Sequence, residues 1–163
     1  MPEVLAGIAL GSNLGDRKAE LDAALAFLRT LASDHKVCES PRFETQPIDC
    51  PVDSPVFLNS FAEIKIDTVF LPPLNLFGCL EEFEIERGRM PFRETNSPRP
   101  IDLDIIYYGN ERFDQMGLII PHPRAHLRRF VLEPLAYVRP DLILPGQTKT
   151  VRELWETMKT QKG

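Results

Sequence analysis

Residues 99–109 read Arg-Pro-Ile-Asp-Leu-Asp-Ile-Ile-Tyr-Tyr-Gly, and this segment constrains the fold more than any other part of the chain. Isoleucine, leucine and tyrosine favour a β-strand, whereas aspartate is depleted from strands. Because side chains alternate between the two faces of a strand, Asp102 and Asp104 point the same way, with Cα atoms about 6.6 Å apart. The fold must therefore keep one face of this strand for two carboxylates.

Two carboxylates at that separation repel each other by roughly 2.5 kcal/mol at an effective dielectric of about 20. Divalent cations remove the repulsion, since Mg²⁺ prefers hard oxygen ligands and carries phosphates, and two ions about 3.5–4 Å apart can be bridged by such a pair. The alternative is that one aspartate pairs with Arg99 or another basic side chain. We predict that Asp102 and Asp104 are metal ligands.

The hydrophobic pattern predicts a βαββαβ order. Strands are expected at residues 4–10, 36–44, 56–66 and in the aspartate segment, and helices after Asp16 and at 71–87. This is the ferredoxin-like α+β order, with both helices on one face of an antiparallel sheet. A C-terminal α/β extension should add a short strand at 118–120 and helices at 129–138 and 150–159, with Pro134 restricting the first turn of the former. No linker or repeat divides the chain, so residues 1–163 are expected to form a single domain.

Composition excludes several classes of protein. The net charge of −5 argues against a nucleic-acid surface. No apolar run reaches the length of a membrane span, and the first residues lack the pattern of a signal peptide. Cys38, Cys50 and Cys79 form neither a CxxC site nor a disulfide framework, which favours a reducing cytoplasm. We expect a cytoplasmic monomer whose partners are small molecules.

Basic residues flank the aspartate strand on both sides. They are Arg87, Arg89, Arg93 and Arg99 before it, and His122, Arg124, His126, Arg128 and Arg129 after it. Arginines around a carboxylate pair suit a polyphosphate that is held by metal on one side and by guanidinium groups on the other. The glycine-containing turn at residues 11–16 could also bind phosphate, but it is no P-loop, and a turn capped by Asp16 is the favoured interpretation.

Phe57 and Phe130, together with Asn59, could hold a flat heterocycle between two rings and read its edge through an amide. From residue type alone, packing in the core is the favoured interpretation for both phenylalanines.

Several segments resemble the 6-hydroxymethyl-7,8-dihydropterin pyrophosphokinase family. They are residues 8–16, 57–59, 84–89, 98–106, 120–124 and 130–135, and the resemblance that they mark extends over nearly the whole chain. The resemblance implies transfer of a pyrophosphoryl group from ATP to the hydroxymethyl oxygen of the pterin, with release of AMP. It also implies two Mg²⁺ ions bound by Asp102 and Asp104.

Further roles are implied by the resemblance, residue by residue. Catalytic roles fall on Arg89, Arg93, Arg99, Asp102 and Asp104. Contacts with the nucleotide fall on Glu84, Arg89, Arg99, Ile105, His122 and Arg128. Contacts with the pterin fall on Thr45, Pro47, Ile48, Phe57, Asn59 and Phe130. The chain departs from the family where many members carry arginine and tryptophan in a catalytic loop, because it has Pro91, Thr95 and Asn96 there and Arg93 is the only arginine inside the loop.

Two other functions remain alternatives. A non-catalytic ferredoxin-like module could bind a pterin or a nucleotide, but it would not need the aspartate pair. A phosphatase with an Asp-x-Asp nucleophile usually carries the first aspartate at the end of a strand, whereas residues 105–108 continue the strand here.

Overall fold

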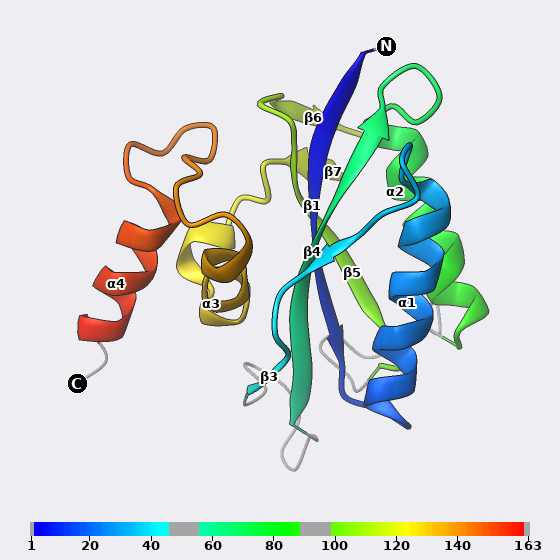
Figure 1. Ribbon diagram of the computed structural model, residues 1–163, viewed down its shortest axis with the longest axis horizontal. Helices are drawn as coiled ribbons and strands as arrows, with labels where there is room; N and C mark the ends of the chain where they lie inside the picture. The colour runs from blue at the N-terminus through cyan, green and yellow to red at the C-terminus, as the bar shows by residue number, and fades with distance from the viewer. Residues whose placement is uncertain (1, 46–55, 89–98, 162–163) are drawn as a thin grey trace.

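A central antiparallel sheet with helices on both faces forms the molecule (Figure 1), in a computed structural model that describes residues 2–45, 56–88 and 99–161. Its strands are β1 (Glu3–Ser12), β2 (Cys38–Glu39), β3 (Phe43–Thr45), β4 (Phe57–Asp67) and β5 (Asp102–Tyr108). The order is β2-β4-β1-β5, and β3 also pairs with β4. Helices α1 (Arg17–Leu31) and α2 (Pro73–Glu86) lie on one face, which confirms the predicted α+β arrangement.

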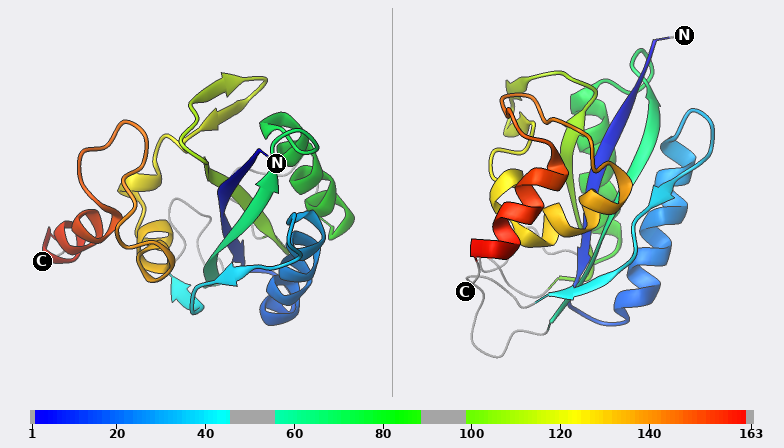
Figure 2. Two further views of the ribbon diagram at one scale, coloured as in Figure 1. Left: turned by 45° about the horizontal axis from the view of Figure 1, so that its top comes forward. Right: turned by 60° about the vertical axis from the view of Figure 1, so that its left-hand side comes forward.

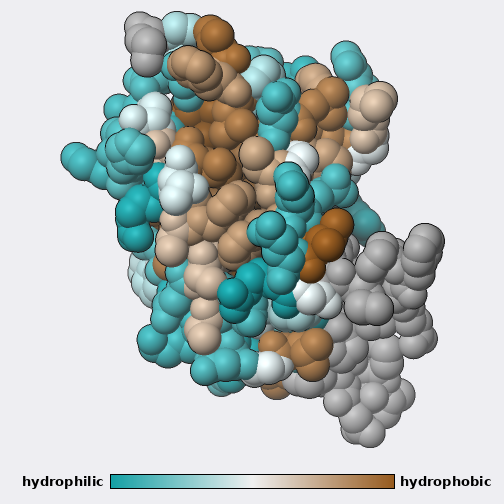
Figure 3. All heavy atoms as spheres, turned by 90° about the vertical axis from the view of Figure 1, so that its right-hand side faces the viewer, coloured by the Kyte–Doolittle hydropathy of each residue, from teal (hydrophilic) through white to brown (hydrophobic). Residues whose placement is uncertain are grey.

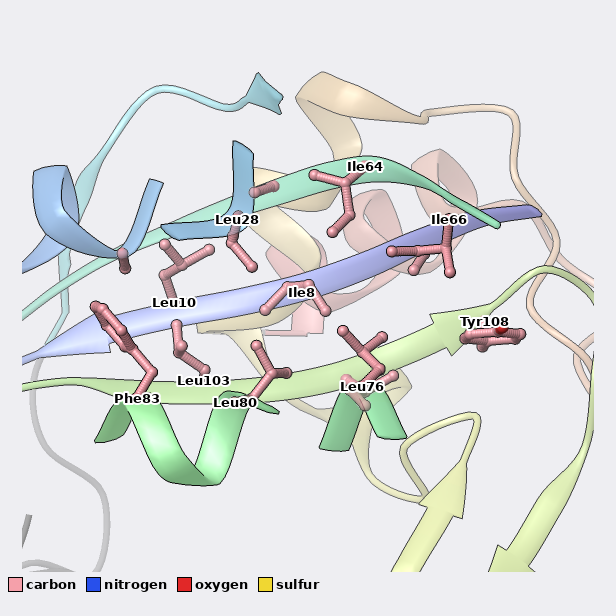
Figure 4. Packing of buried hydrophobic residues seen from close by; sticks show 14 of the residues in the cluster. Ile8, Leu10, Leu28, Ile64, Ile66, Leu76, Leu80, Phe83, Leu103 and Tyr108 are labelled. Atoms are coloured by element: carbon pink, nitrogen blue, oxygen red, sulfur yellow. The ribbon is translucent and has the colours of Figure 1, made fainter. Parts of the chain in front are cut away.

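The first hydrophobic core lies between these two helices and the sheet (Figure 4). Alternate residues of β1, such as Ile8 and Leu10, face Leu28 of α1 and Leu80 of α2, and all four are almost fully buried. Phe27 of α1 stacks on Phe83 of α2 with ring centroids 4.5 Å apart. The buried face of α1 consists of Leu21, Ala24 and Leu28, which recur at helical spacing in the sequence.

Specific residues mark the ends of both helices. The side chain of Asp16 accepts a hydrogen bond from the backbone N–H of Ala19 (3.0 Å) and caps α1. Pro73 is the first residue of α2, where a missing N–H costs nothing. Gly88 follows the helix with a φ of 109°, a conformation that favours glycine.

The strand predicted at residues 36–44, with Pro41 expected near an edge or a bulge, is not continuous. Two short strands, β2 and β3, stand there instead, separated by Ser40, Pro41 and Arg42. Proline cannot donate to a strand ladder. The Ser40 hydroxyl replaces part of the ladder by accepting a hydrogen bond from the backbone N–H of Phe61 (2.9 Å), while the Ser40 N–H donates to the Phe61 carbonyl (2.8 Å).

The chain after β5 builds a second layer on the other face of the sheet (Figure 2). It consists of the 3-10 turn η1 (Ala125–Leu127) and helices α3 (Arg129–Val138) and α4 (Val151–Gln161). The hairpin of β6 (Phe113–Gln115) and β7 (Leu118–Ile120), which follows β5 directly, packs Leu118 and Ile120 into the first core instead. The predicted short strand and both predicted helices are confirmed, whereas β6 and η1 were not foreseen. Pro134 lies buried in the middle of α3, so it does not restrict the first turn as the sequence suggested.

A buried polar cluster ties α3 to the sheet. The Tyr107 hydroxyl donates to Glu63 Oε2 (2.5 Å), and Arg139, at the end of α3, donates to the same oxygen (2.6 Å). Burial raises the pKa of Tyr107, and the neighbouring Glu63 carboxylate raises it further. The tyrosine therefore stays a neutral donor, and the C-terminal end of α3 is fixed to β4 and β5.

Seen from the side that carries α1 and α2, hydrophobic residues gather in a band between hydrophilic margins (Figure 3). Partly buried apolar side chains of both helices pack against the first core, among them Phe27, Leu31, Leu74 and Phe77. Within the described parts of the chain, none of the helices combines the length and apolar character that crossing a membrane requires.

Candidate active site

The sheet face opposite α1 and α2 has a floor of small residues in β1. Gly7, Ala9 and Gly11 alternate with the large residues that fill the first core. In the sheet register, Gly11 lies between Asn59 of β4 and Asp102 of β5. A Cβ atom on Gly11 would lie 2.7 Å from Asn59 Oδ1, closer than real side chains approach. Glycine here leaves room for the Asn59 amide.

Asp102 and Asp104 are half-buried on this face of β5, as the alternation predicts, and Leu103 between them turns into the first core. Arg99 Nη1 lies 3.8 Å from Asp102 Oδ2, near the upper limit for an ion pair. This is the pairing of one aspartate with Arg99 that the sequence left open as an alternative, and the charge of Arg128 also interacts with both carboxylates. Among the described residues, no group of three or more His, Cys, Asp or Glu side chains is placed to hold a metal ion. A metal ion on this pair would complete its shell with water and substrate phosphates.

Arg99 joins the carboxylates to an aromatic ring. Its guanidinium carbon lies 5.3 Å from the centroid of the Phe57 ring, within the range of a cation–π contact. The side chain is 11% exposed, and its Nε is buried without a hydrogen-bond partner among the described residues. A buried guanidinium donor without a partner favours an anion as the missing acceptor.

His122 and Arg128 approach the same carboxylates from the segment after β7. The backbone N–H of His122 donates to the Ile106 carbonyl (3.0 Å), which fixes the histidine beside β5. Burial lowers the pKa of His122 to about 4, helped by the charges of Arg128 and Arg124 and opposed by Asp102. Its Nδ1 accepts the backbone N–H of Arg124 (3.2 Å), so the neutral ring carries its proton on Nε2. Burial also lowers the pKa of Arg128, and both aspartates oppose the shift.

Phe57 and Phe130 are half-buried rather than interior, so core packing alone does not account for them. Each carries an arginine on its ring, and the Arg128 guanidinium carbon is 5.4 Å from the Phe130 centroid. Asn59 is 5% exposed, and its Nδ2 donates to the hydroxyl of Thr45, which is paired with Phe57 across β3 and β4. The structure thus brings Thr45, Phe57 and Asn59 together.

Glu84 and Ile105 are placed differently from the other predicted residues. Glu84 is 3% exposed in α2 and accepts a hydrogen bond from the backbone N–H of Leu103 (2.7 Å), the residue between the aspartates. Ile105 points its side chain into the first core, away from the aspartate face. The backbone N–H of Leu103 points away from β1, toward Glu84. The backbone N–H and C=O of Ile105 point in the same direction, because this direction repeats every second residue of a strand. Contact between Ile105 and a nucleotide is therefore open only to its backbone, not to its side chain.

Four predicted site residues lie outside the described residues: Pro47, Ile48, Arg89 and Arg93.

Two features of the site were missed from the sequence. One is the small-residue floor, which the spacing Gly-Ile-Ala-Leu-Gly at residues 7–11 signals as a strand whose two faces differ in size. The other is Asn13, which was assigned to a turn but bonds to Arg99. No local sequence pattern signals a contact between residues 86 positions apart in the chain.

Comparison with known proteins places this geometry in a family. A profile described as 7,8-dihydro-6-hydroxymethylpterin-pyrophosphokinase (HPPK) matches residues 7–140. The chain is 39% identical over 143 residues to 2-amino-4-hydroxy-6-hydroxymethyldihydropteridine pyrophosphokinase of Haemophilus influenzae, a match that covers 88% of this chain and 86% of that protein. The protein of the same name from Bacillus subtilis is 41% identical over 135 residues, with 82% and 77% covered.

Solved structures agree with the sequence matches at the level of fold. A crystal structure of an HPPK-DHPS protein in complex with substrates superposes on 99% of this chain with a TM-score of 0.78 at 13% identity, and the chain spans 44% of that longer chain. This likeness shows the fold, while the profile and the two bacterial relatives show the family. The chain belongs to the 7,8-dihydro-6-hydroxymethylpterin-pyrophosphokinase family.

Proposed function

We propose that this protein transfers the pyrophosphoryl group of ATP to the hydroxymethyl oxygen of 6-hydroxymethyl-7,8-dihydropterin, in folate biosynthesis. A bond forms between that oxygen and the β-phosphorus, the bond from the β-phosphorus to the α–β bridging oxygen breaks, and the hydroxyl proton is released to solvent. The pterin leaves as its diphosphate, and the nucleotide leaves as AMP.

The observation that carries this proposal is the convergence of two carboxylates and three basic side chains beside a half-buried aromatic pair. Asp102 and Asp104 lie on one strand face, with Arg99, His122 and Arg128 close enough to interact with their charges. The reaction needs little covalent chemistry from the protein, so positioning and charge stabilisation are its main tasks.

Asp102 and Asp104 are the residues that would hold Mg²⁺. Two carboxylates on a rigid strand supply hard oxygen ligands, and the unpartnered Nε of Arg99 provides a donor for an anion beside them. A bound Mg²⁺ would neutralise negative charge on the triphosphate. Two such ions are part of the proposal.

The basic side chains bind the phosphates from the opposite side. Arg99 and Arg128 offer guanidinium donors, and His122 offers a neutral Nε2–H because its Nδ1 is already an acceptor. Arg89 and Arg93 are proposed to add phosphate contacts, Arg93 mainly in the transition state. Glu84 acts on the nucleotide side by holding the backbone of β5, and Ile105 contributes backbone atoms.

The pterin occupies the other end of the same face. Phe57 and Phe130 would stack on its two sides, and Asn59, held by Thr45, would read the polar edge with its amide oxygen and nitrogen. Pro47 and Ile48 are proposed to add backbone contacts along this edge.

One assay tests the proposal. The protein is incubated with the pterin alcohol, ATP and Mg²⁺, and the nucleotide products are separated. AMP and a diphosphorylated pterin are expected, with turnover lost on chelation of Mg²⁺. The appearance of ADP with a monophosphorylated pterin would refute pyrophosphoryl transfer.

We also propose that the protein works as a single-domain monomer in the cytoplasm. Its substrates are small molecules. Light scattering behind a size-exclusion column tests the oligomeric state, and a mass near 18.6 kDa is expected.

A further inference from the structure

We propose that Asn13 is a positioning residue for pyrophosphoryl transfer and acts by holding the backbone of Arg99. This inference rests on the proposed function. Asn13 is 1% exposed, in the turn after β1. Its Oδ1 accepts the backbone N–H of Arg99 (2.8 Å), and its own backbone N–H donates to the Arg99 carbonyl (3.2 Å).

Asn13 thus holds both backbone polar groups of a residue 86 positions later. The two bonds fix where the Arg99 backbone enters the site. Its guanidinium lies over the Phe57 ring and 3.8 Å from Asp102. Arg99 is therefore placed where the pterin, the metal-binding carboxylates and the phosphates meet.

The local roles of the turn are carried by other residues. Asp16 caps α1 through Ala19, and Gly15 supplies the positive φ of 74°. An asparagine in a turn usually bonds to backbone within two residues of itself. The Asn13 Oδ1 instead reaches across the chain to Arg99. Turn formation alone does not explain a buried amide used in this way.

The expected effect lies in turnover. Arg99 must be aligned with the transferring group, and a displacement of about 1 Å in a positioning contact can cost about 10²-fold in rate. Asn13→Ala should therefore lower kcat about 10–100-fold and change the KM for the pterin by less than about threefold. Asn13→Asp keeps an acceptor oxygen at the same place and should restore part of the kcat lost in Asn13→Ala, because the buried carboxylate also carries a desolvation cost.

A double-mutant cycle separates positioning from general destabilisation. If Asn13 acts through Arg99, Asn13→Ala should lower kcat by less than about twofold in an Arg99→Ala background. Asp16→Ala is the matched control, because it removes the α1 cap from the same turn without touching Arg99. It should lower the melting temperature and leave kcat unchanged. Independent, multiplicative effects of Asn13→Ala and Arg99→Ala would overturn the proposal, as would an equal loss of kcat in Asp16→Ala.

A measurement without substrates completes the test. Exchange of the Arg99 backbone amide with solvent, followed by NMR, should become at least about tenfold faster in Asn13→Ala and stay unchanged in Asp16→Ala. Unchanged exchange in Asn13→Ala would refute the link to Arg99 even in an active enzyme. If exchange is faster in Asn13→Ala but the wild-type protein forms no AMP, the link to Arg99 holds and the proposed function fails. The two failures are therefore distinguishable.

Discussion

Gly11→Ala is expected to weaken pterin binding by displacing Asn59. The added Cβ would lie 2.7 Å from Asn59 Oδ1 and 3.5 Å from Phe57 Cδ1, and contacts under 3.0 Å are essentially never seen for real Cβ atoms. The Asn59 amide must therefore move by at least about 0.3 Å. It is held by Thr45 on its other side, so the movement strains or breaks that hydrogen bond.

The magnitude follows from the hydrogen bonds that the amide would make with the pterin edge. Losing one or two neutral hydrogen bonds costs about 0.5–3 kcal/mol, which weakens binding about 2–150-fold. Affinity for ATP should stay within about twofold of the wild type, because the phosphate-binding side chains come from other elements. Isothermal titration calorimetry with each substrate measures both quantities.

Gly7→Ala is the matched control, since it makes the same change on the same face of β1. Its Cβ would lie 2.3 Å from Tyr107 Cε2 and 2.7 Å from Phe61 Cζ, and both rings are buried and stiff. Overpacking of this kind costs about 1–3 kcal/mol. The melting temperature should fall about 2–12 °C. Wild-type pterin affinity in Gly11→Ala, or an equal loss of affinity in Gly7→Ala, would refute the reasoning.

Three further perturbations test other parts of the site and core. Asp102→Asn and Asp104→Asn should each lower turnover about 10²–10⁴-fold, measured as AMP release, with small changes in melting temperature because relieved repulsion and lost attraction to nearby arginines oppose each other. His122 should titrate near pH 4 in NMR spectra. Since the unfolded chain takes up its proton near pH 6.5, the His122 contribution is complete above that pH and is lost as the pH falls toward 4, a loss that His122→Gln should abolish. Ser60→Ala should keep or raise stability in urea titrations by up to about 1 kcal/mol, because the buried Ser60 hydroxyl has no partner among the described residues.

Local patterns determined the elements and the chemistry of the aspartate strand. The period of two placed Asp102 and Asp104 on one face, whatever the rest of the fold, because alternation is a property of the strand itself. The helical spacing of Leu21, Ala24 and Leu28, the Asp16 cap, and Pro73 in the first turn of α2 fixed the helices for the same reason. Each of these signals lies within a few residues of the structure it specifies.

The tertiary structure alone decided which distant residues meet. The register shift between β1 and β5 leaves Ile106 without a partner in β1, and the Ser40 hydroxyl bonds to Phe61 where the strand at residues 38–45 is interrupted. The backbone N–H of Arg99 donates to the side chain of Asn13, 86 positions earlier in the chain. Such contacts depend on strand register and on the closing of long loops, and no window of sequence encodes either. The sequence therefore determined which side chains the site could use, and packing of the two layers decided where each of them stands.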